Sequence, residues 1–309
     1  MVVFDAKLWP SWHVDDRYGA SVAGKSVSSV ITPCDYIDTC GGESTIDELD
    51  VLRSRFDVVD AVRSGPRQKP ELEAELCVSR STVDRAVREL ESTDLLTRVE
   101  EGYTVTLYGE LLAEHYETYV TEAEYVANGR ALLAELSPEV PIDTVVLSGA
   151  EITHSGPPAA HQPITHFEHY LEGASRVRGF LRTITQSTTP EIFLEQAHTG
   201  LNGELILTAE LTDYVLERQL EPARAVLEMG FAVFEVESLP YGLIVLEADE
   251  EVDEQRKFDA IALLFVYDEA NDLLGLIVND SPAAVAWAEA QYLARRERAT
   301  EITDRFFDD

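Results

Sequence analysis

Three arginines in one short segment, Arg80, Arg85 and Arg88, are of the residue type that recognises nucleic acids. In a helix, Ser81, Arg85 and Arg88 share one face, because they lie four and three residues apart, and Arg80 lies at its N-terminal end. A guanidinium can donate two hydrogen bonds to one guanine, and short hydroxyl side chains can bond to phosphate. The pattern therefore predicts a helix that contacts DNA.

The expected contacts divide into base contacts and phosphate contacts. When such a helix enters the major groove, its N-terminal residues meet the base edges. Asp84 departs from the pattern, because it would face phosphate unless it pairs with Arg80 or Arg88 or accepts a hydrogen bond from cytosine. The predicted DNA-binding residues are Arg80, Ser81 and Arg85 at bases, Lys69, Thr82 and Arg88 at phosphates, Arg98 at the backbone or minor groove, and the helix cap Ser79.

The surrounding elements are those of a winged helix-turn-helix. A first helix is predicted from Ser44 to the Ser-Gly-Pro stop at 64–66, because apolar residues recur there at spacings of three and four. A second begins at Pro70 and ends near Leu76. The third runs over 80–92, and its opposite face carries the core-facing Val83, Val87 and Leu90. A hairpin is predicted over 95–107, with its turn at Glu101-Gly102.

The second half of the chain has a different organisation. A long helix is predicted over 109–136, interrupted near Asn128-Gly129, and it is our candidate element for a homodimer. A linker at 137–143 follows. Helix and strand patterns then alternate over 142–304, which predicts an α/β domain with one main sheet, mixed toward its C-terminal end. The predicted strands include "TVVLSG", "GELILTA", "FAVFEV", "YGLIVLE", "AIALLFVYD" and "LLGLIVND".

The charge of the chain is unusual, with 58 acidic and 24 basic residues and a formal net charge of −34. An acidic surface of this kind, with few lysines, is expected in a salt-loaded cytoplasm, although a generic acidic cytosolic protein is the alternative. Six of the basic residues fall within 66–100, so basic residues are concentrated in the predicted DNA-binding segment. At molar salt, repulsion between the acidic remainder and phosphate is screened beyond about 3 Å.

Other segments exclude several classes of protein. No run of apolar residues is long enough for a membrane span, and no secretory signal is evident. The three cysteines, Cys34, Cys40 and Cys77, form neither a disulfide framework nor a four-ligand zinc pattern. Residues 1–43 have no clear period, and we expect them to be poorly ordered or to lie upstream of the natural start. A cytoplasmic location fits best.

Five segments of the chain resemble a known family: "PELEAELCVSRSTVDRAVRELESTDLL", "TVVLSGAEIT", "YLEGASRVRGF", "LPYGLIVLE" and "NDSPAAVAWAEAQYLARRERA". Over about residues 46–300 the chain is similar to archaeal winged-helix transcriptional regulators that carry the methanogenesis-regulatory (filamentation-regulator) middle domain. The resemblance implies a cytoplasmic transcription factor. Its second domain would sense a small-molecule effector or mediate assembly, and the resemblance does not say which ligand is bound.

The hypothesis is therefore a non-enzymatic regulator of transcription that binds double-stranded DNA as a homodimer, without cofactor, metal or membrane. The domains are predicted as an N-terminal extension at 1–43, the winged helix at 44–108, the connecting helix at 109–136 and the α/β regulatory domain at 142–304. A protein-interaction adaptor and an enzyme are the alternatives, but no phosphate-binding loop or nucleophile motif supports catalysis. Four histidines, His154, His161, His166 and His169, are close enough in sequence to suggest a metal, although ordinary surface histidines are the preferred interpretation.

Overall fold

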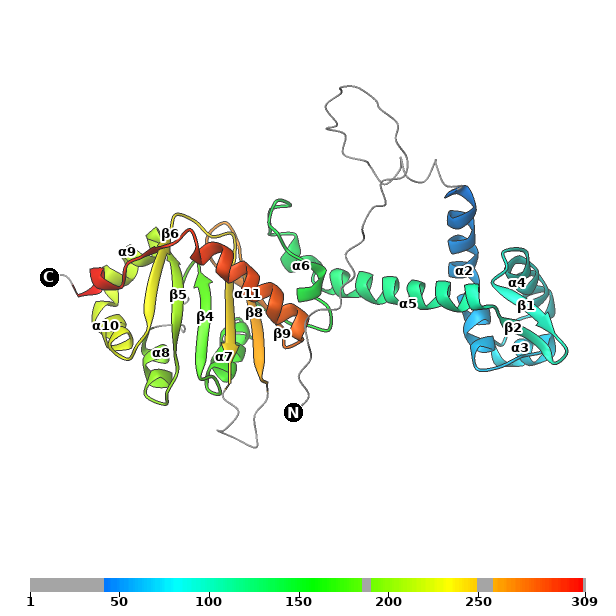
Figure 1. Ribbon diagram of the computed structural model, residues 1–309, viewed down its shortest axis with the longest axis horizontal. Helices are drawn as coiled ribbons and strands as arrows, with labels where there is room; N and C mark the ends of the chain where they lie inside the picture. Colours follow the sequence, from blue (N-terminus) through cyan, green and yellow to red (C-terminus); the bar gives the residue numbers. More distant parts are fainter. Residues whose placement is uncertain (1–41, 185–189, 249–257, 308–309) are drawn as a thin grey trace, which may run out of the picture. The chain divides into compact units, whose positions relative to one another are not determined.

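The computed structural model describes residues 42–184, 190–248 and 258–307 (Figure 1). The chain divides into two compact units, and the division falls between Glu110 and Leu111. Nearly all of the predicted N-terminal extension, including Cys34 and Cys40, lies outside the described residues. The predicted domain boundaries stay a prediction, and each unit is described here by itself.

Over residues 42–105, the first unit contains three helices followed by a two-stranded antiparallel hairpin. In chain order these are α2 (Gly42–Arg63), α3 (Lys69–Glu75), α4 (Arg80–Ser92), β1 (Leu96–Val99) and β2 (Gly102–Val105). This is the element order of the predicted winged helix-turn-helix. Its core consists of the buried apolar side chains Leu52, Val59, Val62, Leu72, Val83, Val87, Leu90 and Leu95.

The hairpin is joined to the loop between α2 and α3 by backbone hydrogen bonds. The amide and carbonyl of Arg67 exchange bonds of 2.9 and 2.8 Å with those of Tyr103. Gly102 allows this approach, because a Cβ atom there would lie 2.3 Å from the carbonyl oxygen of Arg67, and the residue has a φ of +146°. The hairpin is therefore fixed to the loop that precedes α3.

The predicted helix over 109–136 is two helices, α5 (Leu107–Asn128) and α6 (Arg130–Leu133). The predicted interruption at Asn128-Gly129 is confirmed, but the helical segment ends three residues earlier than expected. Several large apolar side chains of α5 are exposed, including Leu107 at 77%, Leu111 at 49% and Tyr119 at 67%. These side chains are not part of either hydrophobic core of the second unit.

The second unit contains one eight-stranded mixed sheet, which confirms the predicted α/β class. Its strands are β3 (Glu151–His154), β4 (Arg176–Leu181), β5 (Asn202–Thr208), β6 (Ala232–Val236), β7 (Gly242–Glu247), β8 (Ala260–Tyr267), β9 (Leu273–Asn279) and β10 (Thr300–Glu301). The spatial order is β10-β6-β5-β4-β7-β8-β9-β3. Pairing is parallel only between β4, β5 and β6, and the remaining pairs are antiparallel.

Helices cover both faces of this sheet. One core joins it to α7 (Gln162–Leu171), α8 (Pro190–Ala197), α9 (Ala209–Arg218) and α10 (Leu220–Glu228). The opposite core joins it to α6, the 3-10 helix η1 (Thr144–Val146) and α11 (Pro282–Arg296). A second 3-10 helix, η2 (Thr303–Phe306), ends the described chain. The unit therefore has three layers, with the sheet in the middle (Figure 1).

The strand predicted at "TVVLSG" is wrong, since this segment forms η1. The side chain of Asp143 caps it by accepting a hydrogen bond of 3.0 Å from the amide of Val145. The buried Asn279 side chain donates to the carbonyls of Val145, Val146 and Ser148, so backbone groups that a strand would pair are bonded to a side chain.

Among the described helices, none combines the length and apolar character that crossing a bilayer requires.

Candidate nucleic-acid interface

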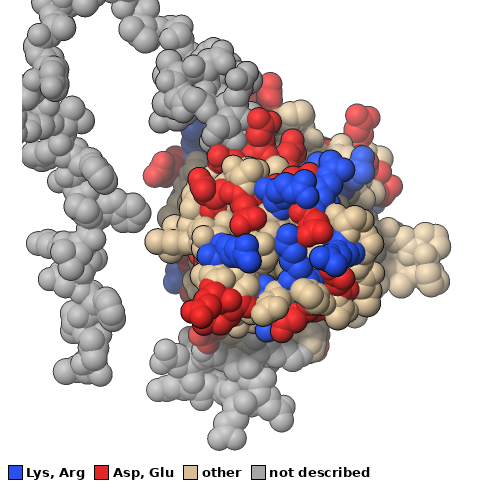
Figure 2. Space-filling model, turned by 90° about the vertical axis from the view of Figure 1, so that its right-hand side faces the viewer, with Lys and Arg blue, Asp and Glu red and all other residues tan. Residues whose placement is uncertain are grey.

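The candidate interface is the surface formed by α3, α4 and the hairpin. Figure 2 shows this end of the molecule, where lysine and arginine side chains gather and acidic side chains lie among them. The orientation of α4 follows from its two faces. Val83, Ala86, Val87 and Leu90 are buried, so the residues between them point to solvent. All eight predicted DNA-binding residues belong to this unit, and the structure brings them onto neighbouring elements.

The N-terminus of α4 carries a cluster of three hydroxyl groups. Ser79 is the N-cap, as predicted, and its Oγ accepts a hydrogen bond of 3.3 Å from the amide of Thr82. The hydroxyls of Ser81 and Thr82 lie 2.9 and 2.8 Å from the same Oγ atom. All three side chains are exposed. The positive end of the helix dipole and these donors therefore face solvent together, an arrangement that suits a phosphate group.

Arg80, Arg88 and Arg98 are exposed cations of the predicted set. The Arg80 side chain is 83% exposed, and its Nε atom lies 4.0 Å from the nearest oxygen of Asp84. Arg88 is exposed on α4, and Arg98 is exposed on β1 opposite Tyr103. Because the ion pair between Arg80 and Asp84 is long, the guanidinium donors of Arg80 are available for a planar acceptor such as the edge of guanine.

Lys69, a predicted phosphate contact, has an ion-pair partner within the unit. Its Nζ atom lies 2.7 Å from Oδ1 of Asp84 and 5.4 Å from the centre of the Tyr103 ring. The hydrogen bond with Asp84 raises the pKa of Lys69, and the same bond lowers the pKa of Asp84. The sequence offered Arg80, Arg88 or a cytosine as partners of Asp84. Arg80 Nε lies 4.0 Å from Asp84, and Lys69 on α3 is the closer partner, a pair that no sequence spacing indicated.

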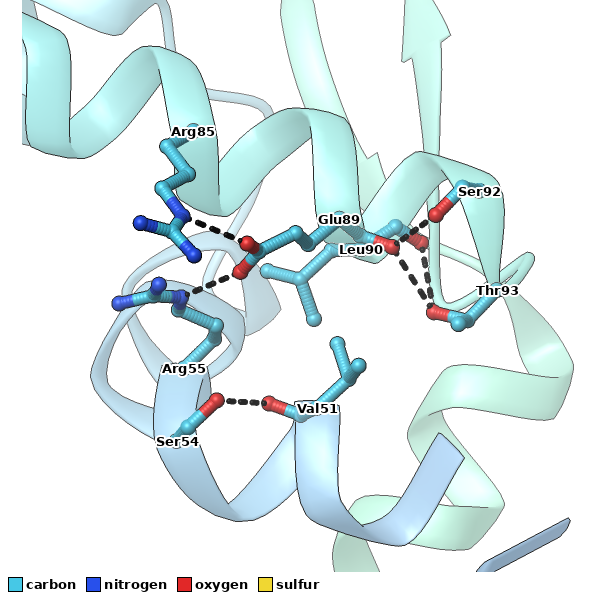
Figure 3. A network of polar contacts seen from close by, with 8 residues as sticks. All are labelled: Val51, Ser54, Arg55, Arg85, Glu89, Leu90, Ser92 and Thr93. Carbon is cyan, nitrogen blue, oxygen red and sulfur yellow. Dashed lines mark hydrogen bonds and ion pairs between the residues drawn. The ribbon is translucent and has the colours of Figure 1, made fainter. Parts of the chain in front are cut away.

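Arg85 shares a carboxylate with an arginine that the sequence did not single out. Its Nε donates to Oε1 of Glu89 at 2.8 Å, and Nε of Arg55 on α2 donates to Oε2 of the same residue at 2.8 Å (Figure 3). Hydrogen bonds from Arg85 and then Arg55 lower the pKa of Glu89. The Arg85 side chain is nevertheless 74% exposed, so it stays accessible from solvent.

The histidine cluster of the second unit has ordinary contacts. His166 Nδ1 lies 3.0 Å from the hydroxyl of Thr153 and 3.5 Å from a carboxylate oxygen of Glu151. The ring of His169 lies beside that of Tyr170. Within the described ranges, no group of three or more histidine, cysteine, aspartate or glutamate side chains is arranged to hold a metal ion.

A cavity of about 70 Å³ lies between the sheet and helices α8, α9 and α10. It is lined entirely by apolar side chains, among them Phe193, Val226 and Phe231. The cavity offers a ligand no side-chain hydrogen bonds.

Two family models match the chain. Residues 160–298 match the model described as the methanogenesis regulatory protein FilR1, middle domain. The FilR1 match extends from α7 to α11. Residues 43–127 match a second model, the HVO_A0261 N-terminal domain, over nearly all of α2, α3, α4, the hairpin and nearly all of α5. The predicted family resemblance is confirmed.

Comparisons with individual proteins give only distant similarities. No curated protein matches the chain. Similar solved structures include TrmBL2, an archaeal chromatin protein, at 13% identity and a TM-score of 0.37, covering 82% of this chain and 98% of that one. Nuc, a phospholipase D family member from Salmonella typhimurium, has 9% identity and a TM-score of 0.37, covering 50% and 97%. NucT from Helicobacter pylori has 13% identity and a TM-score of 0.35, covering 50% and 98%. Such low scores carry no argument about function.

Proposed function

We propose that this chain is a DNA-binding transcriptional regulator whose helix α4 enters the major groove. The observation that carries the proposal is the division of α4 into two faces. Val83, Val87 and Leu90 are fully buried, while Arg80 and Arg85 are 83% and 74% exposed at the N-terminal half of the opposite face. Base contacts are assigned to Arg80, Ser81 and Arg85.

The remaining predicted residues position the unit on the phosphate backbone. Thr82 and Ser79 lie at the N-terminus of α4, Arg88 lies one to two turns further along, and Arg98 extends from the hairpin. Lys69 is assigned to phosphate as well, but its ion pair with Asp84 competes with that contact in the wild-type chain. The tip of the hairpin is assigned a smaller role in contacting DNA, because Glu100 and Glu101 occupy its turn and would repel phosphate.

The proposal includes a salt-rich cytoplasm. With a net charge of −34, the chain repels DNA at long range in dilute buffer. At about 1 M salt the Debye length is about 3 Å, so contacts within the groove dominate. Binding therefore depends on a few directly placed guanidinium groups rather than on a broad basic surface.

A homodimer would supply two recognition helices for two half-sites, which raises specificity beyond that of a single helix. The exposed Leu107, Leu111 and Tyr119 of α5 are the apolar surface proposed for this contact. The FilR1 middle domain is assigned the effector-sensing or assembly function. We assign it no catalysis, in line with the regulator named by the matching model.

The test measures binding of the full chain to genomic DNA fragments at about 1–2 M KCl, a range in which long-range repulsion is screened. The variant R80A/R85A should lose specific retention. The control R218A/R298A removes two exposed arginines from the second unit and changes the net charge equally, so it should bind like the wild type. Equal retention of R80A/R85A and wild type would refute the assignment of α4.

A further inference from the structure

We propose that Arg55 is a positioning residue for DNA recognition, which holds Glu89 in place so that Arg85 can transfer from Glu89 to the DNA. The inference rests on the proposed function and assigns a role to a residue outside the recognition helix. Arg55 is on α2 and Arg85 is on α4, and the two guanidinium groups meet on opposite oxygens of one carboxylate (Figure 3).

The position of Arg55 is set by an irregularity in the backbone. Within α2 it has a φ of −129° and a ψ of 18°, which are not helical values, and the helix is kinked there. Its side chain is only 24% exposed, whereas that of Arg85 is 74% exposed. Arg55 is therefore the less accessible of the two partners of Glu89, and Arg85 is the one that a ligand can reach.

Hydrogen bonds hold both the backbone and the side chain of Glu89. Its backbone carbonyl accepts hydrogen bonds from the hydroxyls of Ser92 at 2.7 Å and Thr93 at 3.2 Å, both near the end of α4. Its carboxylate accepts from the two arginines (Figure 3). The carboxylate thus keeps its place, 32% exposed, one helical turn from Arg85.

The consequence concerns the cost of binding. When Arg85 turns toward a base or phosphate, the Glu89 carboxylate loses one of its two cationic partners, and it lies only one helical turn from Arg85. Arg55 remains on the carboxylate and compensates its charge. Without Arg55, Arg85 would be the sole cation on Glu89 in this network, and moving it to DNA would leave an uncompensated anion at the interface.

The chain provides a matched control in the same unit. Arg63, also on α2, pairs with Glu110 at 2.8 Å, with side chains 21% and 31% exposed, against 24% and 32% for Arg55 and Glu89. The two ion pairs are alike in length and exposure. Only the Arg55 pair shares its carboxylate with an arginine of the recognition helix, so R63Q tests the loss of a similar pair elsewhere.

The experiment measures the dissociation constant of the full chain for one DNA fragment at fixed KCl. R55Q should weaken binding by about five-fold, the size expected for a partly exposed ion pair, and R63Q should leave it unchanged. R55K, which keeps a cation beside Glu89, should restore most of the affinity. In an E89Q background, R55Q should have no further effect, because the carboxylate that Arg55 compensates is gone.

Each other outcome has a definite meaning. Equal weakening by R55Q with and without E89Q would overturn the inference, because Arg55 would then act independently of Glu89, by touching DNA itself or by supporting the fold. An unchanged affinity in R55Q would overturn it as well. Thermal unfolding of R55Q and R63Q shows whether the two lose stability alike. If the wild-type chain itself fails to bind any genomic fragment, the proposed function fails together with the inference.

Discussion

Replacing Asp84 by asparagine is expected to strengthen DNA binding. The carboxylate of Asp84 holds Lys69 Nζ at 2.7 Å and lies 4.0 Å from Arg80 Nε, so it occupies one predicted phosphate contact and faces one predicted base contact. D84N keeps the shape of the side chain and an oxygen for Lys69, but it removes the negative charge. Lys69 can then turn to phosphate without leaving an anion behind.

The magnitude follows from counterion release. Each phosphate neutralised by a cation steepens the dependence of log K on log salt concentration by about 0.9. If Lys69 alone is freed, the ratio of D84N affinity to wild-type affinity should grow by about eight-fold for each ten-fold decrease in KCl, because ten to the power 0.9 is about eight. If Arg80 also gains a phosphate, the slope should steepen by about 1.8.

The assay is fluorescence anisotropy with a fixed DNA fragment over about one decade of KCl, chosen to measure that slope. The control is D213N, which changes the net charge equally at an exposed aspartate of the second unit. D213N should keep the wild-type slope. If D84N also keeps the wild-type slope, or binds more weakly than wild type at every KCl concentration, then Lys69 is not a phosphate contact that Asp84 restrains.

Three further expectations concern stability. N279A removes a buried amide that donates to three carbonyls within 145–148, and it should lower the free energy of unfolding of the second unit by about 2–4 kcal/mol in urea titrations; a loss below about 0.5 kcal/mol would contradict this. The melting temperature of the whole chain should rise with KCl, because salt screens repulsion among charges that sum to −34, and calorimetry showing no dependence would argue against a salt-adapted protein. Burial of Glu204 would raise its pKa, but hydrogen bonds from Tyr292 and Arg296 outweigh it and keep the pKa below 4.5. Its contribution to stability is therefore complete above pH 4.5 and is lost as the pH falls further, so E204Q should flatten the acid limb of the unfolding curve, and an identical limb would count against this pairing.

Local chemistry made the first unit predictable. The spacing of Val83, Val87 and Leu90 sets which side of α4 is buried, and Ser79 marks where the helix begins. The hairpin was predicted with its turn at Glu101-Gly102, and the structure has the turn one residue earlier, at Glu100-Glu101, with Gly102 as the first residue of β2. These signals act between residues close in sequence, so the order of elements and the outward face of α4 could be inferred without coordinates.

The second unit shows where such signals fail. The apolar run at 144–149 has the composition of a strand, yet it begins with a 3-10 helix. Its carbonyls accept hydrogen bonds from the side chain of Asn279, which lies more than a hundred residues later in the chain. Strand β4 was not among the predicted strands, although it lies at the centre of the sheet, because Arg176, Arg178 and Gly179 weaken its apolar pattern. Arg178 is accommodated by Glu247 and Glu289, which only the folded chain brings to it.

By itself, the sequence determined the fold class, the family and the set of cations that α4 presents to solvent. The tertiary structure decided which cations of the first unit form ion pairs between helices, since Asp84 holds Lys69 across 15 residues and Glu89 holds Arg55 across 34. Helical periodicity is a property of neighbouring residues and is visible in one dimension. An ion pair between two helices depends on their packing, and packing is set by the whole core at once.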